Sequence, residues 1–176
     1  MRPARFLWAC ALCVAALFTI SCGYHVAGAA SVLPKNVKTI AIPAFKNNTT
    51  RYKIAELVTS AVAREFISRT HYKIVAEPDN ADAVLSGSVV SFFAYPTTFD
   101  PQTGRAAGVQ VIVYLALSLR DRSSNAALFD RPHMEFRQTY EISVDPQKYF
   151  DESDVAMDRL SRDVARSVVS AVLENF

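Results

Sequence analysis

Alternating positions in the middle of the chain predict a β-sheet. Between residues 108 and 120, valine or leucine stands at every odd position, six times in succession, while the even positions are mixed. A period of two is typical of a strand that buries one face. β-branched or alternating stretches predict four further strands, at 37–45, 71–77, 83–96 and 133–142.

Two other segments repeat their apolar residues at helical spacing. Between residues 51 and 69 these residues are Ile54, Leu57, Val58, Ala61, Val62 and Phe66. After the acidic start at 151–154 they are Met157, Leu160, Val164, Val168 and Val172. The expected fold is therefore an α/β (α+β) two-layer sandwich, with two helices on one face of a mixed four- to five-stranded sheet.

Residues 1–21 have the pattern of a secretory signal. MRPAR supplies two arginines, and the apolar run FLWACALCVAALFTI follows. This run is shorter than the roughly 20 apolar residues that a membrane-spanning helix needs. We expect it to be removed.

Cys22 follows the small residue Ser21 at the end of that run, in a sequence that resembles a bacterial lipobox. Cys10 and Cys13 would leave with the signal, so Cys22 would be the only cysteine of the mature chain. A disulfide within one molecule would then be impossible. We interpret Cys22 as the site of lipid attachment, followed by a tether over 22–36 and one domain over 37–176.

Charge and motifs exclude several classes of function. Without Arg2 and Arg5, the 19 basic residues become 17 and balance the 17 acidic ones, so no basic excess indicates nucleic-acid binding. The three histidines have no metal-ligand spacing, and no nucleophile, phosphate-loop or dinucleotide motif occurs. We therefore expect no catalytic residue, no metal and no cofactor, and a protein that is not an enzyme.

The connection 95–107, YPTTFDPQTGRAA, is longer than a hairpin requires. It carries Phe99 and Arg105, an apolar ring and a cation that an anionic amphiphile could contact together. Both are candidate ligand-binding residues. The alternative is a long hairpin whose DPQTG segment serves only as the turn.

CGYHVAG at 22–28, LPKNVKTIAIPAFKNNTTRYKIAELVTSAVAREF from residue 33, and ADAVLSGSV at 81–89 resemble the LptE family of lipopolysaccharide-assembly lipoproteins. The resemblance implies a two-layer sandwich, acylated at Cys22 (triacylated, with palmitate) and held in the outer membrane on its periplasmic side. It also implies a plug in the LptD-type β-barrel that helps the barrel assemble, and contact with lipopolysaccharide during export. Gly23, after the acylated cysteine, agrees with outer-membrane sorting.

The family's lipid-binding cation in the loop between the central strands has Arg105 as its nearest counterpart. The matching position holds Asp100 or Pro101. The alternative function is an outer-membrane lipoprotein that activates or nucleates another envelope machine. The segment IAIPAFKNNT is similar to openings in curli-secretion lipoproteins and in activators of cell-wall synthases. The 14 residues that follow Cys22, 23–36, are too short a tether to reach the cell wall as such an activator must, since an extended residue spans about 3.5 Å.

Overall fold

The computed structural model describes residues 33–142 and 149–174, all within one compact unit. The predicted signal peptide and Cys22 lie outside the described residues. The last residues of the predicted tether are described, and Leu33 is buried in the hydrophobic core. Packing of the domain therefore extends to residue 33, four residues before the expected first strand.

Within the described residues the sheet has six strands. They are β1 Thr39–Ala41, β2 Lys46–Asn47, β3 Lys73–Val75, β4 Ala83–Phe99, β5 Ala106–Asp121 and β6 Ala127–Glu141. Their order is β3-β1-β4-β5-β6, with β2 pairing β4 beyond β1. β1 is parallel to β3 and β4, and β2 is parallel to β4, whereas β4, β5 and β6 form an antiparallel meander. The sheet is mixed as expected, and its additional strand is the two-residue β2.

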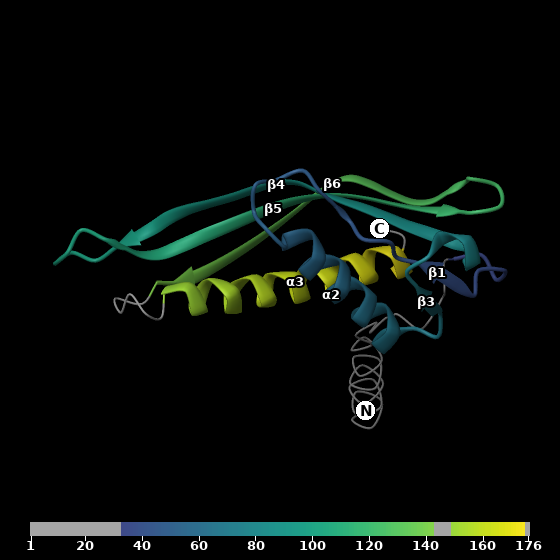
Figure 1. Cartoon of the computed structure of the whole chain (residues 1–176), viewed down its shortest axis with the longest axis horizontal. Helices are drawn as coiled ribbons and strands as arrows, with labels where there is room; N and C mark the ends of the chain where they lie inside the picture. The colour runs from purple at the N-terminus through teal and green to yellow at the C-terminus, as the bar shows by residue number, and fades with distance from the viewer. Residues whose placement is uncertain (1–32, 143–148, 175–176) are drawn as a thin grey trace, which may run out of the picture. The chain divides into compact units, whose positions relative to one another are not determined.

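The helices α2 (Ile54–Arg69) and α3 (Tyr149–Glu174) cover one face of this sheet (Figure 1). The apolar residues expected to face the core do so in both helices, although Leu57 is only partly buried. Every odd residue of β5 from Val109 to Leu119 is buried beneath them. The two-layer α+β sandwich is confirmed.

A glycine inside an apolar strand pattern predicts a possible bulge, and for Gly87 of β4 that prediction is wrong. Gly87 pairs in regular register with Leu117, and the first register shift of β4 lies between Val89 and Ser91. A Cβ at Gly87 would come within 2.8 Å of the side chains of Leu117 and Phe45. Glycine is required at this position because neighbouring side chains pack closely against the backbone. A sequence pattern alone does not show whether a strand glycine serves close packing or a bulge.

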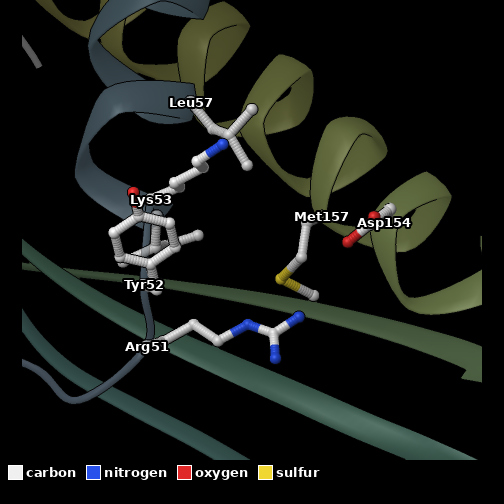
Figure 2. A pocket seen from close by; sticks show the side chains of 7 residues that line it. Arg51, Tyr52, Lys53, Leu57, Asp154 and Met157 are labelled. Carbon is white, nitrogen blue, oxygen red and sulfur yellow. The ribbon is translucent and has the colours of Figure 1, made fainter. Parts of the chain in front are cut away.

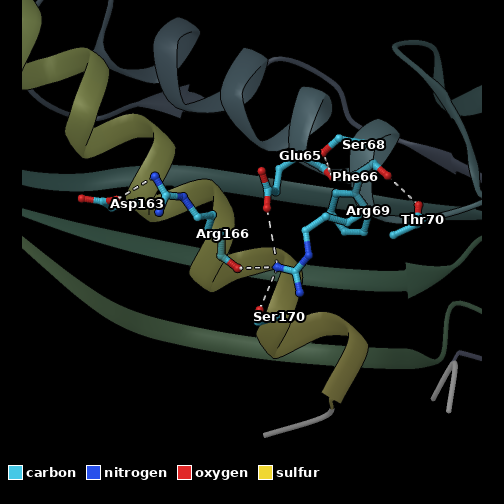
Figure 3. A network of polar contacts seen from close by, with 8 residues as sticks. All are labelled: Glu65, Phe66, Ser68, Arg69, Thr70, Asp163, Arg166 and Ser170. Atoms are coloured by element: carbon cyan, nitrogen blue, oxygen red, sulfur yellow. Dashed lines mark hydrogen bonds and ion pairs between the residues drawn. The ribbon is translucent and has the colours of Figure 1, made fainter. Parts of the chain in front are cut away.

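Arg69 joins the two helices near the end of α2 (Figure 3). Its Nη1 donates to Ser170 Oγ at 2.9 Å and to the carbonyl of Arg166 at 3.5 Å, both on α3. The same nitrogen lies 3.5 Å from Glu65 Oε1. The helix itself ends where the Thr70 N–H and hydroxyl both donate to the Phe66 carbonyl. These contacts fix the spacing of α2 and α3 over the sheet.

Two aspartates hold the end of the sheet where β4 begins and β5 ends. Asp82 Oδ2 accepts the N–H groups of Lys38 and Thr39 at 2.8 Å, which ties the start of β1 to β4 and lowers the pKa of that carboxyl. In the β5–β6 turn, the hydroxyls and N–H groups of Ser123 and Ser124 hold the pKa of Asp121 at about 2. Both carboxylates are therefore ionised at neutral pH and serve as acceptors for turn and strand N–H groups.

Candidate interaction surface

The β4–β5 hairpin extends past the N-terminal end of α3 (Figure 1). Its strands continue further than the sequence indicated, to Phe99 and from Ala106, so that only residues 100–105 form the turn. The Asp100 N–H donates to the Arg105 carbonyl at 2.8 Å, and the Gly104 N–H donates to the Asp100 carbonyl at 2.8 Å. Gly104 has φ of 67°, a conformation that glycine adopts without steric cost. The expectation that DPQTG supplies the turn is confirmed.

The structure places Phe99 and Arg105 at the two ends of this turn. Phe99 is 58% exposed and Arg105 is exposed, so neither side chain is used for the core. The carboxylate of Asp100, the only acid of the turn, accepts the N–H groups of Gln102 and Thr103 at 2.7 and 3.1 Å. The turn thus carries an exposed apolar ring and an exposed cation at one end of the sheet, the two kinds of group that an amphiphilic anion would contact.

An aromatic row crosses the face of the sheet that the helices do not cover. Phe93 of β4 makes an edge contact with Tyr114 of β5, with ring centroids 6.2 Å apart, and Tyr114 stacks at 4.8 Å against His133 of β6. Beside the row, the Tyr95 hydroxyl donates to Gln110 Oε1 at 2.6 Å. The sequence pattern does not predict this row, because only the strand register brings Tyr114 and His133 together.

Beside Tyr114, two charged residues of this face form an ion pair. Glu135 forms an ion pair with Arg137, which lowers the pKa of Glu135 and raises that of Arg137. Glu135 also accepts a hydrogen bond from Tyr114 and so raises the pKa of that phenol. At neutral pH the part of the face around Tyr114 therefore presents a neutral phenol and a compensated ion pair.

A shallow cavity of about 500 Å³ opens between the start of α2 and the first part of α3 (Figure 2). Its walls combine cationic, aromatic, acidic and apolar side chains: Arg51, Tyr52, Lys53, Ile54, Leu57, Asp154 and Met157. The Arg51 guanidinium lies 5.7 Å from the ring centroid of Phe92, so the cavity borders β4. Lys53 precedes α2 in a left-handed conformation with φ of 62°.

The described part of the chain offers no metal centre. No three His, Cys, Asp or Glu side chains within residues 33–142 and 149–174 come together as a metal would require. In the same ranges, none of the helices combines the length and the apolarity needed to cross a membrane.

Comparison with known proteins identifies relatives of this chain. The model of a lipopolysaccharide-assembly family, LptE, matches residues 37–172. No curated protein matches the sequence.

Solved structures share the fold at low sequence identity. The solution structure of lipoprotein B from Nitrosomonas europaea is 14% identical, with a TM-score of 0.51, and the match covers 81% of this chain and 90% of that one. A PelC dodecamer subunit from Paraburkholderia phytofirmans is 18% identical, with a TM-score of 0.50, over 78% of this chain and 89% of that one. At these identities the likeness concerns the fold alone.

Proposed function

Because the chain belongs to the LptE family of lipopolysaccharide-assembly proteins, we propose that it is an outer-membrane lipoprotein that plugs an LptD-type β-barrel. It helps that barrel assemble and takes part in the export of lipopolysaccharide to the cell surface. The family match, which spans most of the described domain, is the observation that supports this proposal most strongly. Family membership implies a role in assembly without catalysis.

The proposed anchor is Cys22, acylated and inserted in the inner leaflet of the outer membrane. One acyl chain binds a membrane only marginally, whereas several chains give stable anchoring. The domain then works on the periplasmic side, next to the barrel.

The proposed contact with lipopolysaccharide is the hairpin turn that carries Phe99 and Arg105. Lipopolysaccharide is an anionic amphiphile, with phosphates that pair with a guanidinium and acyl chains that pack on an aromatic ring. Support comes from the exposure of both side chains and from the engagement of Asp100 within the turn, where its carboxylate accepts two backbone N–H groups.

Arg105→Glu is expected to weaken binding of the purified domain to lipopolysaccharide roughly tenfold or more. The change removes one charge-assisted contact, worth about 1.5–3 kcal/mol, and adds a repulsive charge. Binding is measured by titration of immobilised lipopolysaccharide. Arg64→Glu, the same charge change at an exposed position of α2, is the control and should bind like the unaltered chain. Equal affinity of Arg105→Glu and the unaltered chain would remove the hairpin turn from the proposed site.

A further inference from the structure

The described part of the sheet has two long open edges. One is β6, the last strand of the meander. The other is the second half of β4, because β1 and β2 pair β4 only at Ala83–Val84 and Ser88–Val89. From Val90 to Phe99, β4 therefore has β5 on one side and no described strand on the other.

The two edges differ in chemistry. β6 carries five charged residues and a proline, features that prevent a strand from pairing with foreign chains: Asp130, Arg131, Pro132, Glu135, Arg137 and Glu141. β4 has no charged residue in 17 positions. It also carries four of the large apolar side chains that the described domain exposes, which are Val90, Phe93, Tyr95 and Phe99. The edge of β4 shares a proline, Pro96, with β6 but has none of its charges, so it lacks most of the protection that β6 has.

The direction of the backbone groups on this edge follows from Pro96. Proline has no N–H, so within a paired strand its nitrogen lies on the side without a partner, here away from β5. The register is regular from Ser91 to Pro96, so Phe92 and Ala94 also turn their N–H and C=O groups to the open edge. Before the bulge, the Val89 carbonyl points the same way and accepts the Asn48 N–H at 3.0 Å.

We propose that the β4 edge from Val90 to Tyr95 is a strand-addition site for an extended, uncharged segment of a partner protein. Six residues give a pairing length of about 20 Å, bounded by Asn48 at one end and Pro96 at the other. Backbone hydrogen bonds to Phe92 and Ala94 bind the segment, and alternate side chains contact Phe93 and Tyr95. An uncharged edge complements an uncharged segment, since a charge facing it would be desolvated without a counterion.

A second copy of this chain fits the edge less well. A stable dimer uses about 20–30 residues on each side, far more than this edge provides. A short segment of a larger partner, held by further contacts elsewhere, needs no more than the edge offers. The identity of that partner rests on the proposed function. On that basis, the added segment belongs to the polypeptide of the LptD-type barrel.

The test compares substitutions at Ala94 in the chain co-expressed with the LptD-type barrel of its own host. Ala94→Pro removes the outward N–H and leaves the pairing with β5 intact, so the barrel recovered per tagged chain is expected to fall about fivefold, the effect of one lost hydrogen bond. Ala94→Ser keeps the N–H and is the matched control, expected to recover as much barrel as the unaltered chain. The melting temperature of each variant shows whether it folds. Ala94→Lys keeps the N–H and adds a charge to the edge, so it is also expected to reduce the recovery of barrel. It replaces Ala94→Pro as the test if the proline variant does not fold.

The outcomes separate the two proposals. If the unaltered chain recovers no barrel, the proposed function is wrong. If the unaltered chain recovers the barrel, and Ala94→Pro and Ala94→Lys each recover as much barrel as the unaltered chain, the strand-addition site is wrong while the proposed function stands. A photo-reactive p-benzoylphenylalanine at Ala94 should cross-link to one barrel segment. A cross-link to a second copy of this chain would overturn the proposal in favour of self-pairing.

Discussion

A Cys22→Ser chain is expected to carry no acyl groups and to lose its own attachment to the outer-membrane lipid, so that only chain bound to the barrel stays in the outer-membrane fraction. The sequence offers no second thiol at a lipobox-like position, so the loss of acylation should be complete. Because membrane affinity grows by about 0.8 kcal/mol with each buried CH₂ group, no surface of the domain is expected to replace several acyl chains. Intact mass spectrometry of the purified chain and separation of the two membranes on a density gradient measure both effects.

Cys13→Ser is the matched control for this experiment. The residue lies in the same apolar run, but bulky Leu12 precedes it where a small residue is expected. The Cys13→Ser chain should be acylated and sorted normally. Acyl groups on the Cys22→Ser chain would contradict the assignment of the anchor and of the end of the signal peptide.

Phe66→Ala is expected to cost about 3–5 kcal/mol of the free energy of unfolding. The side chain is fully buried in the core between α2 and the sheet, so its removal leaves a cavity. For a domain of this size the loss corresponds to a decrease of roughly 10–15 °C in melting temperature. Urea unfolding of the domain, monitored by circular dichroism, gives the value directly.

Ile67→Ala provides the control on the neighbouring residue. Ile67 is 62% exposed on the same helix, so its truncation removes little buried surface and should change stability by less than about 1 kcal/mol. Similar losses for both variants would mean that α2 does not face the sheet as described.

The long elements of the fold could be predicted from the sequence. The alternation in β5 is so regular that its six odd residues from Val109 to Leu119 could be assigned to one face, and all six are buried. The apolar stripe of α3 was likewise predicted, because burial against a sheet demands one apolar face of a helix. Long amphipathic elements carry many repeats of the pattern, so single exceptions do not obscure it.

Short pairings and special positions could not be predicted. β2 comprises two polar residues, Lys46 and Asn47, and only its partner β4 makes it a strand. Gly87 resembled a bulge because its packing partners Phe45 and Leu117 are remote in sequence. The first register shift, at Val90, lies in an apolar run without a turn residue to mark it.

The candidate interaction surface could likewise be predicted only in part. Phe99 and Arg105 were found from the length and composition of the connection, and their roles remain predictions. The uncharged β4 edge could be recognised only after the topology showed which half of the strand has no second neighbour. Composition identifies residues that could bind a partner, while strand order determines which of them a partner can reach.

The central claim is the association of this chain with a large β-barrel of the LptD type. The measurement that tests it most directly is purification of the chain, carrying a C-terminal tag, from outer membranes of its own host in a mild detergent. Mass spectrometry of the eluate is expected to find one LptD-type barrel for each chain. Recovery of a cell-wall synthase in its place, or of the abundant chain with no barrel, would contradict the claim and favour an activator of another envelope machine.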